Sequence, residues 1–387
     1  MKLIVEPADG VGPLLSAINH AKRSVEAAIF RFDRRDIEAA LMAAAARGVR
    51  VTALIAFHNR GGEKSLRELE LRFLDAGIIV ARTSGDLVRY HGKYIIIDRH
   101  TLYVLSFNFT RLDIDRSRGF GIITTAPNVV REATNLFKAD CTRTRYVPKV
   151  DTFVVSPANS RRVCGTFLKR AKTQLLIYDP SIADREMLRI LHDRAKAGVE
   201  IRVIGKLAGR AFFDVQKLAG MRLHTRTIIR DRRQAFIGSQ SLRTLELDAR
   251  REVGLIIQDP KAIKKLIDTF ESDWTEVAAR KTKGKADPIA NDDATKKSTG
   301  ASARQVSRAI AVFTQELQPL TTAVKRAVRQ AVVKAGDDVL HDKSVKNTMK
   351  QVVKDAVKEA VKEAVHDAQG AEAAHDAKTG EPSRRVH

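Results

Sequence analysis

The sequence HGKYIIID at residues 91–98 and the sequence HTRTIIRD at residues 224–231 decide the fold, because they are two copies of one pattern. Each copy starts with a histidine, carries a cation two residues later and closes on an aspartate. The apolar β-branched residues in between favour a strand. Because side chains alternate along a strand, the histidine and the cation of each copy project from the same side.

The two copies belong to a longer internal repeat. Two small polar residues follow each histidine at equal spacing, Ser106 and Asn108 in the first copy and Ser239 and Ser241 in the second. The offset between the copies is 133 residues in this part, whereas it is 150 upstream, between AKRSVEAAIF at 21–30 and AKTQLLIYDP at 171–180. One deletion of 17 residues in the second copy accounts for the change. We interpret the pattern as a duplication.

Each copy predicts the same order of elements: a helix, an apolar strand, a second helix and a second apolar strand. This order is typical of βαβ units with parallel strands. We therefore expect an α/β fold of two similar sandwich repeats around one active site, with repeat 1 at residues 1–148 and repeat 2 at residues 149–278. The extra length of repeat 1 lies between Phe57 and Tyr90, and we expect it to form a loop on the substrate side.

The composition changes after Trp274, where large apolar residues become rare and charged residues frequent. This change predicts a disordered linker at residues 279–301. Residues 302–387 predict a basic helical tail, because valines recur at i, i+4 spacing between lysines and acids. Self-association through these helices and surface contact with an anion are two interpretations of the tail, and a loosely helical solvated segment is the third.

The net charge points to an anionic partner. Lys and Arg total 69 against 46 Asp and Glu, which gives +23. Residues 281–387 contribute +6 of this charge and residues 1–280 contribute +17, so the excess belongs mainly to the predicted repeats. A field of this sign favours nucleic acid or an anionic lipid surface. A basic surface that serves solubility alone is the alternative interpretation.

Several classes of protein are disfavoured. The longest apolar run, residues 39–46, is far shorter than the roughly 20 residues that cross a bilayer as a helix. The first ten residues lack the apolar stretch of a secretory signal. These features predict a cytoplasmic protein, with peripheral contact at a membrane as an extension. Cys141 and Cys164 are far apart and lack metal-ligand spacing, so they predict neither a disulfide framework nor a zinc site.

The paired histidines and cations suit phosphodiester chemistry. Cations such as Lys93 and Arg226 neutralise the non-bridging oxygens of a phosphodiester as charge develops. A neutral imidazole is a nucleophile near pH 7, and a second one in the imidazolium form donates a proton. His91 and His224 therefore supply both functions without a metal or another cofactor.

The two motifs resemble those of the phospholipase D superfamily, in particular bacterial members with two HKD motifs in one chain, over about residues 10–275. This resemblance implies one active site shared by both halves. It also implies that one histidine forms a phosphohistidine while the other protonates the leaving alcohol and then activates water or an acceptor alcohol. By this analogy His91 attacks and His224 is the acid and base, although the reverse assignment stays open.

The resemblance also assigns supporting roles. Ser106, Asn108, Ser239 and Ser241 would bind phosphate or support the motifs, and Asp98 and Asp231 would be structural. Arg226 stands where the family has lysine, so we expect retained binding and an altered rate. An acid that orients the catalytic histidine is present in repeat 2 as Glu252, whereas repeat 1 has Gly119 at the aligned position. We expect Glu252 to orient His224, and His91 to use another acid such as Asp115.

Three functions are compatible with these features. The first is a phospholipase D-type phosphodiesterase or phosphatidyltransferase that acts on phospholipids. The second is a nuclease of the same superfamily that acts on DNA or RNA, which the charge of the repeats favours. The third is a catalytically weak protein that binds polyanions, since Arg226 and Gly119 depart from the family pattern.

Overall fold

The computed structural model describes residues 1–57, 63–83 and 87–283. The chain divides into two compact units, Met1–Pro288 and Ile289–His387, and all described residues belong to the first. The predicted helical tail therefore lies outside the described residues, as does most of the predicted linker. The last described helix continues to Lys283, so its end lies past residue 278, where the linker was expected to begin.

Repeat 1 forms a mixed sheet with helices on both faces. Its elements are β1 (Lys2–Glu6), α1 (Gly12–His20), β2 (Ser24–Ile29), α2 (Arg35–Ala46), β3 (Arg50–Ile55), α3 (Glu63–Asp75), β4 (Ile79–Arg82), β5 (Arg89–Tyr90), β6 (Tyr94–Ile97), β7 (Thr101–Leu105), α4 (Arg111–Arg116), β8 (Ser117–Thr124) and α5 (Pro127–Thr142).

Repeat 2 follows the same plan. Its elements are β9 (Phe153–Val155), α6 (Ser160–Lys169), β10 (Gln174–Ile182), α7 (Arg185–Lys196), β11 (Glu200–Leu207), β12 (Asp214–Gln216), β13 (Arg222–Leu223), β14 (Arg226–Arg230), β15 (Gln234–Gly238), α8 (Thr244–Asp248), β16 (Arg250–Arg251), β17 (Val253–Ile257) and α9 (Pro260–Lys283).

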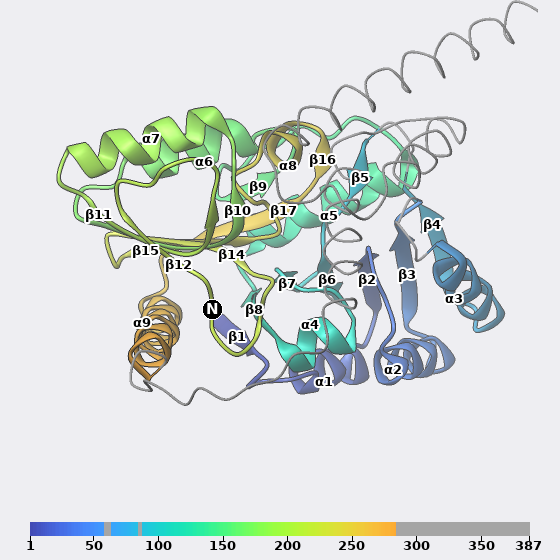
Figure 1. Cartoon of the computed structure of the whole chain (residues 1–387). Helices are drawn as coiled ribbons and strands as arrows, with labels where there is room; N and C mark the ends of the chain where they lie inside the picture. The colour runs from blue at the N-terminus through green and yellow to red at the C-terminus, as the bar shows by residue number, and fades with distance from the viewer. Residues whose placement is uncertain (58–62, 84–86, 284–387) are drawn as a thin grey trace, which may run out of the picture. The chain divides into compact units, whose positions relative to one another are not determined.

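The strand orders of the two sheets are equivalent. The first sheet runs β4-β3-β2-β6-β7-β8-β1, and the second runs β12-β11-β10-β14-β15-β17-β9. The predicted βαβ units are present, because β2 pairs with β3 and β10 pairs with β11 in parallel. The predicted pair of α/β repeats is therefore confirmed (Figure 1). Part of the extra length of repeat 1 forms α3, since the described residues between β11 and β12, the equivalents of β3 and β4, form no helix. The expected substrate-side loop also includes residues 58–62 and 84–86, which lie outside the described residues.

Each repeat contributes a short strand to the other repeat. β13 of repeat 2 pairs in parallel with β8 of repeat 1, and β5 of repeat 1 pairs in parallel with β16 of repeat 2. β5 and β13 are the segments directly before the two motif histidines. The exchange therefore places both motifs at the contact between the repeats.

The interface between the repeats is buried and contains two equivalent ion pairs. Its apolar core includes residues from both sheets together with α5 and α9. Arg118 of repeat 1 donates two hydrogen bonds of 2.8 Å to Asp273, and Arg251 of repeat 2 donates one of 3.0 Å to Asp140. Breaking such a buried pair by removing one partner typically costs about 3–5 kcal/mol. These pairs therefore fix the orientation of the repeats that the shared site requires.

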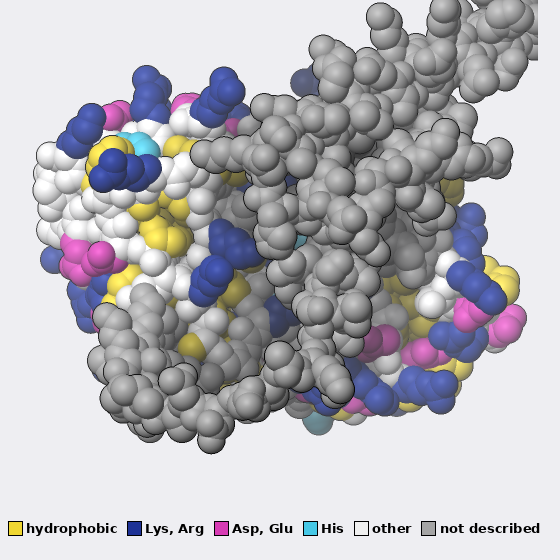
Figure 2. All heavy atoms as spheres, in the orientation of Figure 1, with side chains coloured by type: hydrophobic (Ala, Val, Ile, Leu, Met, Phe, Trp, Pro, Cys, Tyr) yellow, Lys and Arg dark blue, Asp and Glu magenta, His cyan; other side chains and the backbone are white. Residues whose placement is uncertain are grey.

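The outer faces of the sheets are covered by helices with separate cores. α1 and α2 pack on one face of the first sheet, and α6 and α7 pack on the corresponding face of the second. Lys and Arg side chains are prominent on the surface near α7 and near α3 in Figure 2. This distribution agrees with the positive charge of the repeats.

Candidate active site

Both motif histidines are held by the backbone of the other repeat. The backbone N–H of His91 donates to the carbonyl oxygen of Arg251 at 2.7 Å, and that of His224 donates to the carbonyl oxygen of Arg118 at 3.1 Å. Both side chains are buried. The pKa of each imidazole is lowered well below its usual value, first by burial and then by Lys93 and Arg226, which act on both rings. The two histidines therefore share one cationic environment, and burial favours their neutral forms while the site is empty.

The structure corrects the predicted partner of Glu252. Its Oε2 lies 2.7 Å from Nδ1 of His91, in the other repeat, and not against His224. The carboxyl group is fully buried, and burial raises its pKa while the nearby Lys93 opposes that effect. Asp115, the acid expected beside His91, instead accepts hydrogen bonds from Arg34. The physical reason is the strand exchange, which brings the end of β16 against the residue that follows β5.

The contact with Glu252 determines the tautomer of His91. A carboxylate accepts a hydrogen bond from a ring N–H, so the proton of neutral His91 lies on Nδ1. Nε2 then carries the lone pair that can attack phosphorus. The ring also packs edge-on against Phe30, with 4.6 Å between the centroids, which limits its rotation.

His224 has a different environment. Its Nε2 lies 3.5 Å from Oδ2 of Asp113, and its Nδ1 is buried without a hydrogen-bond partner among the described residues. The counterpart of Glu252 in repeat 1 is Gly119, where an added Cβ would lie 2.9 Å from the ring of Phe107. The space for a second orienting acid is therefore occupied by an aromatic ring.

Sequence reasoning missed Asp113. It lies in the first turn of α4, where Thr110 caps the helix by accepting a hydrogen bond from the Asp113 N–H. Burial favours its neutral form, but His224, the backbone N–H of Asn108 and Arg222 outweigh that effect and hold its pKa below the usual range. The equivalence of Asp113 and Glu246 at the 133-residue offset was the signal that could have identified it.

The two motif cations are positioned in the same way. Lys93 Nζ donates to the carbonyl oxygen of His91 at 2.6 Å, and Arg226 Nη1 donates to that of His224 at 2.6 Å. Burial lowers the pKa of Lys93 to about 7, with Arg226 adding to the effect and Glu252 opposing it. An arriving phosphate would restore full charge on Lys93, since an adjacent anion favours the ammonium form.

The four small polar residues mainly hold the site together. The hydroxyls of Ser106 and Ser239 accept hydrogen bonds from backbone N–H groups of the neighbouring strands, at 2.9 Å and 3.1 Å. Asn108 donates from its side-chain amide to Asp113 at 2.6 Å, and the Ser241 hydroxyl accepts from Arg226 Nε at 3.2 Å. Asn108 and Ser241 therefore touch the groups that surround the histidines.

The motif aspartates lie at the far ends of their strands. Asp98 accepts hydrogen bonds from the backbone N–H groups of residues 22–24, and Asp231 accepts from those of residues 172–174. Both carboxylates thus bind the chain where β2 and β10 begin. Neither lies beside the histidines.

Additional arginines lie near Phe30, whose ring packs against His91. Arg31 and Arg89 place their guanidinium carbons 5.7 Å and 5.5 Å from the Phe30 ring centroid. Arg250, on β16, is in register with Arg89 and contributes to the lowered pKa of His91. Sequence reasoning did not identify these residues, because the strand pairing that joins them is not encoded in either motif.

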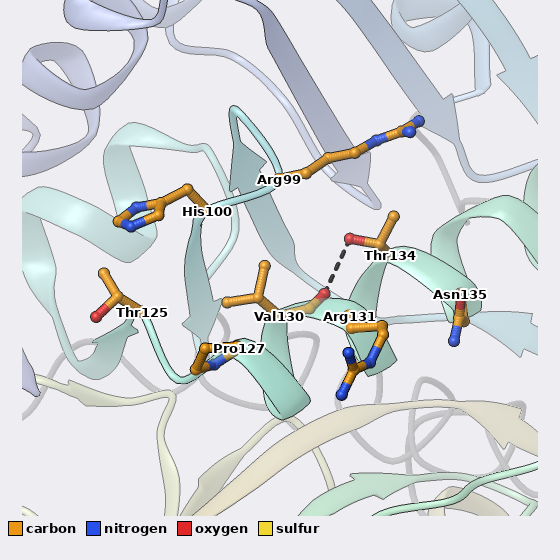
Figure 3. Close-up of a pocket in the computed structure, with 8 residues that line it drawn as sticks. All are labelled: Arg99, His100, Thr125, Pro127, Val130, Arg131, Thr134 and Asn135. Atoms are coloured by element: carbon orange, nitrogen blue, oxygen red, sulfur yellow. Dashed lines mark hydrogen bonds between the residues drawn. The ribbon is translucent and has the colours of Figure 1, made fainter.

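A surface pocket of about 360 Å³ lies elsewhere (Figure 3). It is lined by residues of the turn between β6 and β7 and of the first turns of α5, including His100 and Arg131. His91 precedes β6 whereas His100 follows it, so the pocket is at the opposite end of that strand from the site.

The described residues contain neither a membrane-spanning helix nor a cluster of metal ligands. None of their helices is long and apolar enough to span a bilayer. No group of three or more His, Cys, Asp and Glu side chains among them is arranged to hold a metal ion.

The duplicated α/β fold and the shared pair of histidine motifs define the class of the protein as the phospholipase D superfamily. A family model described as "Cardiolipin synthase, PLD-like domain" matches residues 14–141 and 165–274. The chain belongs to this PLD-like family, whose superfamily consists of enzymes that transfer or hydrolyse phosphodiesters. Among curated protein sequences, none matches the chain significantly.

Two solved structures with TM-scores above 0.5 show the same fold. A polyphosphate kinase from Porphyromonas gingivalis is 19% identical, with a TM-score of 0.59 over 70% of this chain and 46% of the kinase. The chain thus spans less than half of that enzyme. A phosphatidylserine synthase from Haemophilus influenzae is 10% identical, with a TM-score of 0.52 over 71% of this chain and 85% of the synthase. Nuc from Salmonella typhimurium, a phospholipase D family member, is 27% identical over 38% of this chain and 97% of Nuc, with a TM-score of 0.34.

Proposed function

We propose that this protein is a metal-independent phosphodiesterase or phosphatidyltransferase that acts on phospholipids through a phosphohistidine on His91. The contact between His91 and Glu252 carries this proposal, because it leaves the lone pair on Nε2 of a neutral, buried imidazole. The carboxylate of Asp113 raises the pKa of His224 against the effect of burial, and the anionic phosphate of a bound substrate would further favour its imidazolium form.

In the first step Nε2 of His91 attacks phosphorus while Lys93 and Arg226 neutralise the non-bridging oxygens. The bond from phosphorus to the leaving oxygen breaks, and imidazolium His224 gives its proton to that oxygen. Glu252 stabilises the positive charge that develops on the ring of His91. The product of this step is the phosphohistidine, with His224 neutral.

In the second step His224 takes a proton from water or from an acceptor alcohol. The resulting oxygen nucleophile attacks phosphorus, the phosphorus–nitrogen bond breaks, and His91 returns to its neutral form. Hydrolysis results when water is the acceptor, and transfer results when an alcohol is the acceptor. The same residues therefore serve both reactions.

Two exposed leucines support a lipid substrate. Leu112 and Leu245 occupy equivalent positions on α4 and α8, with 49% and 38% of their surfaces exposed. Each directly precedes a buried acid of the site, Asp113 or Glu246. Apolar side chains at such positions favour contact with acyl chains or with the interfacial region of a bilayer.

A nuclease of the same superfamily is the second candidate. The arginines near Phe30 and His91, namely Arg31, Arg89 and Arg250, are the observation that favours it. Guanidinium groups bind phosphates through paired hydrogen bonds, and a nucleic acid presents phosphates at regular intervals.

The deciding experiment offers the purified protein, with EDTA present, either radiolabelled phospholipid vesicles or plasmid and single-stranded DNA. Release of the lipid head group supports the first candidate, and DNA cleavage supports the second. Turnover of neither substrate by a folded protein supports a polyanion-binding function and contradicts the proposal.

The variants His91→Ala and His224→Ala should each abolish turnover while circular dichroism remains unchanged. With a p-nitrophenyl phosphodiester, whose leaving group departs without a proton, His224→Ala should accumulate phosphohistidine detectable by mass spectrometry. A covalent phosphoryl group on any residue other than His91 would contradict the assigned nucleophile.

A further inference from the structure

Arg250 is a partly buried cation whose hydrogen-bonding capacity is only partly used. Its side chain is 13% exposed, and its Nη1 donates to Oε1 of Glu246 at 3.1 Å. Its Nε is buried and has no hydrogen-bond partner among the described residues. A buried donor without a partner is unfavourable, because it has lost its hydrogen bond to water. An anion that binds at the exposed part of the guanidinium would supply acceptors, and would reach Nε once the side chain turns toward it.

Arg250 belongs to the site although it is not part of either motif. The charge of Arg250 helps to lower the pKa of His91. The carbonyl oxygen of the next residue, Arg251, accepts the hydrogen bond from the His91 N–H. A short chain of contacts also joins Arg250 to Arg226, since Arg226 Nε donates to the Ser241 hydroxyl and the Ser241 N–H donates to Glu246. Arg250 is thus connected through Glu246 and Ser241 to one of the cations that neutralise the scissile phosphate.

The two halves of the site differ at this position. Arg89 and Arg222 are equivalent residues, each two positions before a motif histidine. Arg222 is paired in register with Ser117 and forms an ion pair with Asp113. Arg89 is paired in register with Arg250. Arg250 and Ser117 thus occupy equivalent positions in the two halves. This position carries a guanidinium on the His91 side and a hydroxyl on the His224 side.

We propose that Arg250, together with Arg89, forms a second anion subsite beside His91, so that the substrate carries another phosphate group next to the scissile phosphodiester. This inference rests on the proposed function and narrows its substrate class. Two sources share the required chemistry: a phospholipid with two phosphates and a nucleic acid with consecutive phosphates. A phospholipid with a single phosphate would leave the subsite unused.

The subsite is tested first by calorimetry, which does not depend on turnover. Orthophosphate and pyrophosphate are titrated into the wild-type protein, into Arg250→Gln and into Arg89→Gln. We expect pyrophosphate to bind the wild type at least about 10-fold more tightly than orthophosphate, since a hydrogen bond to a charged group is worth about 1.5–3 kcal/mol. In Arg250→Gln this preference should fall to about twofold or less. Arg35→Gln, at an exposed position on α2, is the control and should keep the preference.

Turnover assays then distinguish a phospholipid from a nucleic acid as the source of the second phosphate. One arm compares vesicles of phosphatidylglycerol with vesicles of cardiolipin, and the other compares a dinucleotide with its 5′-phosphorylated form. A preference of the wild type for the two-phosphate member of either pair, reduced in Arg250→Gln, supports the subsite and identifies its source.

Equal binding of the two inorganic anions by the wild type would overturn the inference, as would a pyrophosphate preference that survives in both arginine variants. A pyrophosphate preference without turnover of any substrate would retain the subsite and refute the proposed function. If Arg250→Gln does not fold, Arg89→Gln carries the same comparison.

Discussion

Replacing Glu252 by glutamine should slow formation of the phosphohistidine while leaving the fold intact. The bond from Nδ1 of His91 to this carboxylate is 2.7 Å long and fully buried. A charge-assisted hydrogen bond of this kind is worth about 1.5–3 kcal/mol, which corresponds to a loss of about 10- to 150-fold in rate. The amide can also donate to Nδ1, which would move the ring proton to Nε2 and remove the attacking lone pair.

The assay is the pre-steady-state burst of p-nitrophenolate from a p-nitrophenyl phosphodiester. This leaving group departs without a proton, so the burst reports attack by His91 and not proton donation by His224. Asp113→Asn is the matched control. It should change the burst rate by less than about threefold, but it should slow the release of an alkyl alcohol much more. A burst rate for Glu252→Gln within twofold of the wild type would refute the assigned role.

Three further predictions concern stability. Burial raises the pKa of Glu6 from 4.5 to about 8, so the folded state holds a proton that the unfolded state has lost between these values. The stability contributed by this group therefore falls as pH rises through that window. In denaturant titrations, the free energy of unfolding of Glu6→Gln relative to that of the wild type should rise by up to about 5 kcal/mol between pH 4 and pH 8.5. Gly119→Ala should lower stability by about 1–3 kcal/mol, measured by thermal unfolding, because its Cβ would lie 2.9 Å from Phe107. Asp273→Asn should cost about 3–5 kcal/mol in the same measurement, since it leaves Arg118 buried without its ionic partner; an unchanged melting temperature would contradict the importance of the interface pair.

The repeat and the fold class could be predicted from the sequence, because they depend on local patterns. The two motifs encode a strand, a histidine and a cation within eight residues, and constant offsets encode the duplication. The structure places the motif histidines and cations in one environment, as the paired-motif argument requires.

The partners of the histidines could not be predicted, because they depend on contacts between distant segments. Glu252 follows the motif of repeat 2 in sequence, and this nearness suggested His224 as its partner. The exchange of β5 and β13 instead places Glu252 against His91, 161 positions away. Arg250 was missed for the same reason. Only the register of β16 with β5 shows that it neighbours Arg89.

Each repeat supplies a carboxylate to the histidine of the other repeat, and this exchange affects how the two halves of the site can become different. If two identical subunits formed the site, a glycine at position 119 would be present in both, and both imidazoles would lack an acid equivalent to Glu252. Joining the repeats in one chain uncouples these positions, so Gly119 and Glu252 can coexist. A covalently linked pair can therefore specialise its two imidazoles for unlike tasks, whereas a symmetric dimer must keep them alike.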